Sequence, residues 1–311
     1  MPKILTEDRT HLSQTLPGHQ IFWDSTSIGA FLKCPRYYYY SMLCGYRPKD
    51  ESIHLSFGSL YHAGLEHFDE MRVVGFSHDA AVEYMIWYIL IRVEREGWGS
   101  EDPKKNKETL LRTLVWYTEE YKEDTFQTYI LADGTAAVEL SFRFNFPFHA
   151  ESGEQYGLCG HFDKVAQDSL GNLYILDKKT SGGGITSYYF ANYTPDVQMT
   201  LYSLAGQLVL EKPIAGVIVD AAQLAVGFSR FARGVVTRSK GSLEEFMGQL
   251  RTVFDLAEWY AKREEWPMQQ TSCDKYGGCQ FRGVCGADPS VREHFLRADF
   301  KVEPWNPLIE R

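Results

Sequence analysis

Apolar residues in the first third of the chain recur at helical intervals. Over residues 56–74 they lie three and four positions apart, which predicts a helix with His62 and Glu66 on one face. A shorter helix before it is predicted to stop at Pro35, and the polar, unpatterned residues 1–20 are predicted to form an arm. The same periodicity, together with N-cap residues such as Ser77 and a capping box that starts at Ser242, predicts four more helices, over residues 78–96, 106–121, 196–210 and 242–263.

The period of the pattern changes after Gly134. Val138, Leu140, Phe142 and Phe144 alternate with polar or charged residues, which is typical of a strand with one buried face. Further strands are predicted over residues 157–166, 173–177, 217–224 and 233–238. A chain that mixes these strands with long helices is expected to form an α/β fold.

Composition narrows the class of protein. The 311 residues are 44% hydrophobic and 14% aromatic, as in a folded chain, and the formal net charge of −9 excludes a globally basic nucleic-acid coat. The most apolar stretch, residues 82–93, is too short for a membrane helix and carries Glu83 and Arg92, so no membrane association is expected. Residues 1–8 contain no apolar segment of a secretory signal, so the expected compartment is a reducing cytoplasm.

The cysteines are grouped. Three of the six, Cys273, Cys279 and Cys285, lie within thirteen residues that also contain several glycines. Disulfides are disfavoured in a reducing compartment, so this segment predicts a metal or cluster site. Cys44 and Cys159 have no partner at ligand spacing and are interpreted as small buried residues.

Two carboxylates and a lysine follow one another on the predicted strands 157–166 and 173–177. Asp163 and Asp177 would lie at the ends of adjacent strands, where hard oxygen ligands can share one Mg²⁺ or Mn²⁺. Lys179 leaves the second strand on the same side as Asp177. Such a lysine can hold the water that attacks a phosphodiester, whereas a lone Asp-x-Lys is more often an ordinary solvated turn. His161 should point to the opposite face from Asp163 and is left out of this site.

An ordered series of motifs along the chain favours a metal site over a solvated turn at Asp177-x-Lys179. The sequence resembles the PD-(D/E)XK nuclease superfamily and, within it, the RecB-like nucleases with an iron-sulfur cluster, such as CRISPR adaptation nucleases, exonuclease V-type enzymes and phage exonucleases. The resemblance extends from residue 25 to 285 and rests on the following segments, in order: Phe31-Leu32-x-Cys34-Pro35-Arg36-Tyr37-Tyr38, Phe57-Gly58-x3-His62-x2-Leu65-Glu66, Glu139, Gly160-x2-Asp163, Asp177-x-Lys179, Gln198-x3-Tyr202 and Cys273-x5-Cys279-x5-Cys285. Comparable family members often space the last cysteines as C-x2-C-x5-C, so this spacing departs from the pattern.

The resemblance implies a restriction-endonuclease-like core with a central mixed sheet flanked by helices, and a cysteine-ligated module formed by both termini. Residues 1–50 would form an arm with the first cluster cysteine, residues 51–267 the nuclease core with a helical insertion at about 77–125, and residues 268–311 the cysteine-rich segment. It implies a metal-dependent deoxyribonuclease, an exonuclease acting on single strands or duplex ends. The settings would be recombination, repair or CRISPR adaptation, with partner proteins from those processes.

The resemblance also assigns roles to residues. His62, Asp163 and Asp177 would hold Mg²⁺ or Mn²⁺, and Lys179 would position water. Gln198 and Tyr202 would organise the site, while Glu139 matches a family glutamate without a settled role. Glu66 is either a further metal-site residue or a surface carboxylate. Four cysteines would hold a separate 4Fe-4S cluster or, alternatively, structural Zn²⁺: Cys34, Cys273, Cys279 and Cys285.

Contacts to DNA need positive charge in an acidic protein. Residues 221–243 contain no Asp or Glu, so this stretch predicts a local nucleic-acid-binding surface made by Arg230, Arg233, Arg238 and Lys240, unless it is a solvated loop. The aromatic run 37–40 either stacks on unpaired bases or packs around the cluster. An alternative reading of the whole chain is a catalytically inactive DNA-binding or scaffolding subunit of a recombination or adaptation complex, which intact Asp163, Asp177 and Lys179 disfavour.

Overall fold

The computed structural model describes residues 10–50, 52–275 and 278–309. The chain forms two compact units. Among the described residues, unit 1 contains 10–50, 142–160, 240–275 and 278–309, and unit 2 contains 52–141 and 161–239. Two of the boundaries fall within strands β4 (Val138–His149) and β5 (Gln155–Gln167), so each of these strands contributes to both units.

Unit 2 is built on a mixed sheet. The last part of β5 pairs antiparallel with β6 (Leu173–Ser181) and with the short β3 (Gln127–Thr128). β6 runs parallel to β7 (Ile214–Leu224), and β7 pairs antiparallel with β8 (Ser229–Val236), with Val217 opposite Val236. The predicted strands are confirmed. β4 to β7 extend beyond their predicted ranges, whereas β8 begins four residues earlier and ends two residues earlier than predicted.

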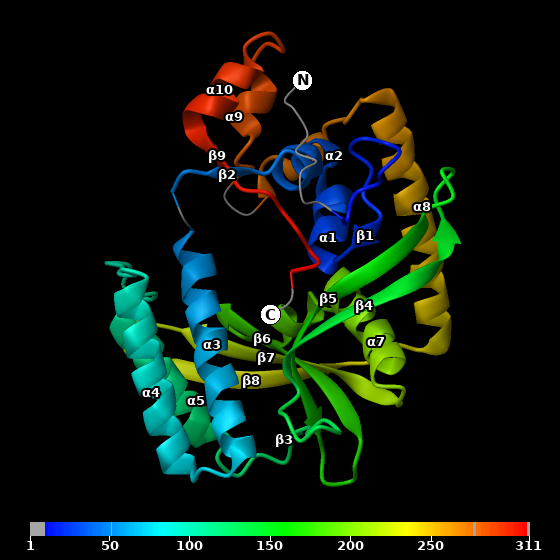
Figure 1. The fold of residues 1–311 in the computed structure, drawn as a ribbon. Helices are drawn as coiled ribbons and strands as arrows, with labels where there is room; N and C mark the ends of the chain where they lie inside the picture. The colour runs from blue at the N-terminus through cyan, green and yellow to red at the C-terminus, as the bar shows by residue number, and fades with distance from the viewer. Residues whose placement is uncertain (1–9, 51, 276–277, 310–311) are drawn as a thin grey trace. The chain divides into compact units, whose positions relative to one another are not determined.

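Helices of unit 2 cover this sheet (Figure 1). α3 (Ile53–Val74), α4 (His78–Arg95) and α5 (Lys107–Glu120) pack on one another around Leu60, Ile89 and Leu114, and this cluster reaches the sheet at Ala222 and Leu224 of β7. Gly64 allows the close approach, because a Cβ there would lie 2.9 Å from the side chain of Leu114. The short α6 (Ser187–Ala191) precedes α7 (Val197–Val209), which packs on β6 and β7. The predicted N-cap Ser77 accepts a backbone hydrogen bond, and so do Asn106 and Asp196, which cap α5 and α7.

Unit 1 joins segments from both ends of the chain. Its first part contains β1 (Phe22–Trp23), α1 (Ser25–Lys33), α2 (Pro35–Tyr38), the π-helix η1 (Tyr39–Leu43) and β2 (Tyr46–Pro48). Its last part contains α8 (Lys240–Arg263), η2 (Gln270–Ser272), α9 (Arg282–Gly286), α10 (Arg292–Asp299) and β9 (Phe300–Val302). β2 and β9 pair antiparallel, and β1 pairs parallel with the first part of β5. Within the described residues, no helix is both long and apolar enough to cross a membrane.

The predicted stop at Pro35 is confirmed, because α1 ends at Lys33, and Pro35 then opens the separate helix α2, where a proline at the first position needs no N–H donor. Two other local predictions for unit 1 were wrong. α8 begins at Lys240, so Ser242 and Glu245 lie inside the helix rather than at its start. Residues 1–9 lie outside the described residues, but His11, Leu12, His19 and Gln20 are buried, so the second half of the predicted arm is part of the core.

The buried His19 makes the stability of unit 1 sensitive to acid. Its Nε2 lies 2.8 Å from the Tyr156 hydroxyl, and burial lowers the pKa of His19 to about 4, against the charges of Glu258 and Glu154 that raise it. The unfolded chain takes up a proton near pH 6.5 and the folded chain only near pH 4, so stability is lost as pH falls through this window.

We therefore expect denaturant titrations at pH 7 and pH 5 to show a fall of roughly 2 kcal/mol attributable to His19. His19→Gln, which keeps a polar group beside Tyr156, should lose less stability over the same interval. Equal losses in the two proteins would show that folding does not lower the pKa of His19.

Candidate active site

The two aspartates and the lysine singled out in the sequence lie in unit 2 on β5 and β6. Asp163 and Asp177 are both buried. Alternation along β6 separates the side chains of its Asp-Lys-Lys run. Lys179 turns toward α7, where its Nζ donates to Gln198 Oε1 over 2.9 Å, whereas Lys178 turns toward α3, where its Nζ lies 3.6 Å from Asp69.

A hydrogen-bonded chain fixes the lysine. Lys179 Nζ donates to Asp177 Oδ1 over 3.0 Å and lies between that carboxylate and Gln198. Gln198 Nε2 in turn donates to the Tyr202 hydroxyl over 3.0 Å, and the Tyr202 ring packs edge-on against Phe162. The spacing Gln198-x3-Tyr202 places both residues on one face of α7, so the structure brings together the residues that the sequence predicted to organise the site. Their effect is to hold the ammonium in one position.

A second group gathers around Asp163. His62 projects from α3, and its Nδ1 lies 3.5 Å from Asp163 Oδ2, the same oxygen that accepts a 2.7 Å hydrogen bond from the backbone N–H of Lys178. His62, Glu139 and Asp163 each offer a ligand atom, and these three atoms lie within 4.8 Å of one another. The structure thus unites His62 with Asp163 as predicted and adds Glu139. Asp177 stands outside this close group and is paired with Lys179.

Glu139 is the site residue that the sequence left without a role. It is buried and has a φ of +43°, in the left-handed region that non-glycine residues with long side chains rarely adopt. An unfavourable backbone conformation at a buried acid beside a histidine and an aspartate is the kind of strain found at functional sites. Alternation along the predicted strand could not reveal it, because alternation assumes extended backbone at residue 139.

The two aspartates differ in the direction of their pKa shifts. Burial alone would raise the pKa of Asp163, but the neighbouring His62 outweighs it and holds the pKa of that carboxyl well below its usual range. Burial raises the pKa of Asp177 to about 6 against the charge of Lys179, and the nearby Asp163 adds to the rise. Burial disfavours the charged form of Lys179, but the carboxylates of Asp177 and Asp163 raise its pKa, so Lys179 is an ammonium ion. The site therefore contains one firmly ionised and one readily protonated carboxyl group.

Glu66 belongs to the same acidic surroundings. Burial raises the pKa of Glu66 to about 7, and the charges of Glu139 and Glu70 add to the rise. Its position one turn after His62 on α3 brings it toward the group around Asp163. The side chain is half-buried and is influenced by the charge of Glu139, which favours a place beside the site over a surface carboxylate.

Asp69 was not found from the sequence, although it follows His62 by seven residues and so lies on the same face of α3. This buried aspartate accepts hydrogen bonds from Lys164 Nζ at 2.7 Å and from Thr128 at 3.0 Å, and its other oxygen lies 3.6 Å from Lys178 Nζ. Lys164 and Lys178 each directly follow a site aspartate in the sequence. The network therefore ties α3, which carries His62, to the two strands that carry Asp163 and Asp177.

The donor set fits a divalent cation. Carboxylate oxygens with one imidazole suit Mg²⁺ and especially Mn²⁺. Asp177 Oδ2 is buried and makes no hydrogen bond, although Lys179 Nζ lies 2.8 Å away outside hydrogen-bonding angles. Asp177 Oδ2, which has an ion pair with Lys179 but no hydrogen bond, is the oxygen that remains open to a cation.

The four cysteines of the predicted cluster all lie in unit 1. Cys34 is buried at the junction of α1 and α2, while Cys273, Cys279 and Cys285 are half-buried. The backbone N–H of Gln269 donates to Cys34 Sγ over 3.3 Å, which places the exit of α8 against the first cysteine. Burial raises the pKa of the Cys285 thiol to about 11 against the charge of Arg36, and the nearby Cys279 and Cys34 add to the rise. Cys44 and Cys159 are both buried, as predicted.

The predicted basic surface is not uniform. Arg230 is exposed beside Phe228, and Lys240 is exposed in unit 1 with Glu244 at 3.7 Å. Arg238 donates to Thr200 and to the backbone of residue 193. Arg233 is mostly buried and bonded to Asp220 and Asp124, an internal network that leaves it little freedom to contact a phosphate. His161 bonds to Ser141, away from the site, as expected.

A mixed sheet that carries two buried aspartates and a lysine held by a Gln-x3-Tyr pair defines a nuclease. Comparison with known sequences identifies the nuclease superfamily. The chain belongs to the PD-(D/E)XK nuclease superfamily, whose family model matches residues 25–286. None of the curated proteins matches the sequence.

Two solved structures show similarity to this chain. A candidate exonuclease from Eubacterium rectale is 11% identical, with a TM-score of 0.44 over 86% of this chain and 89% of that one. A protein named SSO0001 is 10% identical, with a TM-score of 0.32 over 76% of each chain.

Proposed function

We propose that this protein hydrolyses the phosphodiester bonds of DNA with a divalent cation and acts from strand ends. The observation that carries the proposal is the chain from Asp177 through Lys179 to Gln198, which holds an ammonium ion beside buried carboxylates. An ion-paired lysine of this kind serves no evident packing purpose. Processing of free DNA ends, as recombination, repair and CRISPR adaptation require, would use this activity.

His62, Glu139, Asp163 and Asp177 are the residues that would hold Mg²⁺ or Mn²⁺. When bound, the cation would lower the pKa of a coordinated water and offset charge that develops on the phosphate. Asp163 is suited to permanent ligation because its carboxylate stays ionised at all ordinary pH values. Glu66 and Asp69 would act from α3, Glu66 by adding negative charge and Asp69 by fixing the two lysines next to the ligands.

Lys179 would orient the attacking water and stabilise the negative charge on the phosphate in the transition state. Its high pKa makes it a donor rather than a base, so a proton from the water would have to leave to another acceptor. Gln198 and Tyr202 would keep the ammonium from turning away when Asp177 engages the cation. Pre-positioning of this kind lowers the cost of reaching the transition state.

The mode of attack can be tested with linear and circular DNA. An enzyme that acts from ends should degrade a linear single strand in the presence of Mn²⁺ and leave a covalently closed circle of the same sequence intact. Gel analysis of both substrates over time makes this comparison. Equal loss of the circle would replace the exonuclease proposal with an endonuclease.

The histidine and glutamate ligands should be visible in a metal titration. We expect His62→Ala and Glu139→Ala each to raise the Mn²⁺ concentration needed for half-maximal cleavage about tenfold or more, because each removes one donor atom from the close group. Cleavage by the unaltered protein should be faster with Mn²⁺ than with Mg²⁺, since imidazole favours the former.

His67→Ala is the matched control for this titration. His67 lies on the same helix but stacks on Tyr88, outside the group around Asp163. If His62→Ala and His67→Ala give the same metal dependence, His62 is a packing residue.

For unit 1, we propose a 4Fe-4S cluster held by Cys34, Cys273, Cys279 and Cys285, as in the RecB-like nucleases that the sequence resembles. Besides burial, the thiols of Cys279 and Cys34 raise the pKa of Cys285, so the three side chains lie near one another, which supports the proposal. Structural Zn²⁺ is the alternative occupant, because four thiolates also satisfy its tetrahedral shell.

A further inference from the structure

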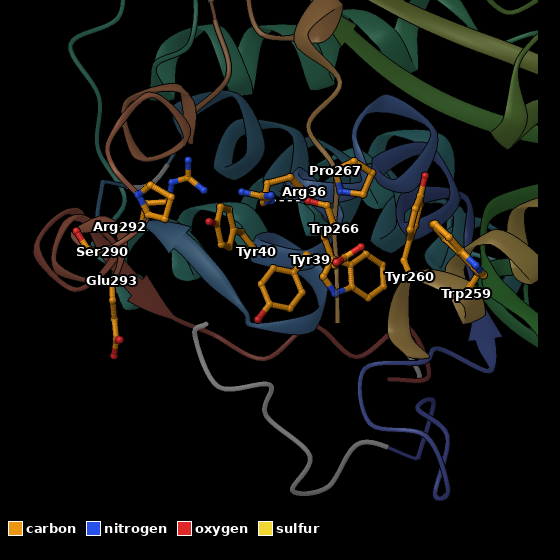
Figure 2. Close-up of a pocket in the computed structure, with 12 residues that line it drawn as sticks. Arg36, Tyr39, Tyr40, Trp259, Tyr260, Trp266, Pro267, Ser290, Arg292 and Glu293 are labelled. Carbon is orange, nitrogen blue, oxygen red and sulfur yellow. Dashed lines mark hydrogen bonds between the residues drawn. The ribbon is translucent and has the colours of Figure 1, made fainter. Parts of the chain in front are cut away.

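Unit 1 contains a pocket of about 800 Å³ (Figure 2). It is lined by the start of the α2–η1 region, by the end of α8 with the residues after it, and by the start of α10. Sites that enclose small molecules commonly measure about 300–1,000 Å³. No residue of the site around Asp163 and Lys179 contributes to it.

A row of aromatic rings forms the wall of this pocket. Figure 2 shows the rings following one another across it, and the centroids of successive rings are 5.5, 5.6, 5.9 and 5.3 Å apart. The row, which we call the ring row, consists of Tyr40, Tyr39, Trp266, Tyr260 and Trp259. The Trp259 end of the row is open to solvent, since Trp259 is 51% exposed, whereas Tyr39, Tyr40 and Trp266 are buried.

Hydrogen bonds from Arg36 hold the backbone of the ring row at Trp266 and Pro267. Arg36 donates from Nε to the carbonyl oxygen of Trp266 over 2.5 Å, and from its backbone N–H to the carbonyl oxygen of Pro267 over 3.1 Å. These bonds join α2 to the segment after α8, across more than two hundred residues of sequence. Rigid aromatic side chains lose little conformational entropy when a flat ring stacks on them.

Positive charge accompanies the rings. The guanidinium groups of Arg36 and Arg292 lie at the Tyr40 end of the row in Figure 2. Arg292 donates to the carbonyl oxygens of Ala287 and Cys285, and within the described residues no carboxylate lies at ion-pair distance from either arginine. At the other end, the Arg263 guanidinium lies 4.9 Å from the centroid of the Trp259 ring.

The acids of the pocket do not cancel this charge. Glu265 pairs with Arg263 at 2.9 Å, and Glu293 pairs with Arg297. Each carboxylate therefore already has its own arginine, which leaves Arg36 and Arg292 as the charges offered to a ligand. The pocket thus combines flat apolar surfaces with an anion-binding end.

We infer that this pocket binds unpaired nucleotides, with a base stacked at the open end of the ring row, on Trp259 and the partly exposed Tyr260, and phosphate at Arg36 and Arg292. Aromatic platforms with flanking arginines are the general means by which proteins hold single-stranded nucleic acid without reading its sequence. The inference rests on the proposed function, because a DNA substrate provides such nucleotides. A free mononucleotide has the same chemistry and is the other source of the ligand.

The test is binding of a fluorescein-labelled thymidine oligonucleotide, followed by anisotropy without added divalent cation so that no cleavage occurs. We expect Trp259→Ala to weaken binding about tenfold, since loss of one stacking platform has an effect of this order. Trp259→Phe, which keeps an aromatic face, should restore most of the affinity. Trp87→Ala, at a 59% exposed tryptophan on α4, is the matched control and should bind like the unaltered protein.

Competition distinguishes the two sources. Unlabelled oligonucleotide that displaces the probe at far lower concentration than thymidine monophosphate would assign the pocket to a strand, and the reverse would assign it to free nucleotide. Unchanged affinity in Trp259→Ala would overturn the inference, even if the protein cleaves DNA. Conversely, weakened binding in Trp259→Ala would uphold the inference even if no cleavage were detected under any condition. The binding experiment and the cleavage experiment can therefore fail independently.

Discussion

We expect Lys179→Ala to reduce DNA cleavage about a thousandfold or more while leaving the protein folded. Lys179 is the ammonium ion held between Asp177 and Gln198, and the loss of a positioned charge of this kind costs roughly 4 kcal/mol of transition-state stabilisation. Folding should tolerate the change, because the Asp177 carboxyl, whose pKa burial already raises to about 6, can take up a proton when its partner is removed. Initial rates on end-labelled DNA measure the effect.

Asp177→Asn should give a loss of similar size, since an amide cannot replace a carboxylate as a metal ligand at the buried Oδ2 position. Lys122→Ala is the control. That lysine pairs with Asp79 and Glu119 on the surface of unit 2 and should be dispensable. Near-normal rates in either site variant, with circular dichroism unchanged, would remove these residues from the mechanism.

The second large effect concerns the cysteines of unit 1. If they hold a 4Fe-4S cluster, protein purified without oxygen should be brown and contain about four irons per chain. Cys34 is about 240 positions from Cys273, so the cluster would cross-link distant segments. Cross-links that close long loops contribute on the order of several kcal/mol, although for a cluster this is an analogy with disulfides.

Cys34→Ala, Cys273→Ala, Cys279→Ala and Cys285→Ala should therefore each lower the iron content and the melting temperature together. Cys44→Ala is the comparison, because that thiol is buried but lies outside the proposed ligand set, so the iron content should stay unchanged. Colourless protein with one zinc per chain would refute the cluster and keep the cross-link. Unaltered stability in all four variants would refute both.

Much of the site could be predicted because its residues lie in regular elements. Asp177 and Lys179 share a face of β6 by the two-residue period of a strand, and Gln198 and Tyr202 share a face of α7 by the helical period. The order of the motifs then supplied the pairing of His62 with Asp163, which no local pattern contains. For the first two pairs, a simple period carried the information.

The parts that were missed depend on contacts between distant segments. The left-handed backbone at Glu139 breaks the period of the predicted strand, so the family resemblance pointed to this residue while the local pattern did not. Asp69 gains its importance only from Lys164 and Lys178 on two other strands. Arg233 was predicted to be a surface cation because its partners, Asp220 and Asp124, are distant in sequence. The burial of His11 and His19 in a polar segment has the same origin, since packing decided it rather than composition.

The most direct test of the account is cleavage of DNA labelled at either the 5′ or the 3′ end by the purified protein with and without Mn²⁺. The account predicts release of labelled nucleotides or short products that requires Mn²⁺ and stops when the cation is chelated. The same preparation of Lys179→Ala should release none. Absence of cleavage by the unaltered protein on both labelled strands, single and duplex, would contradict the central claim that Asp163, Asp177 and Lys179 form a working nuclease site.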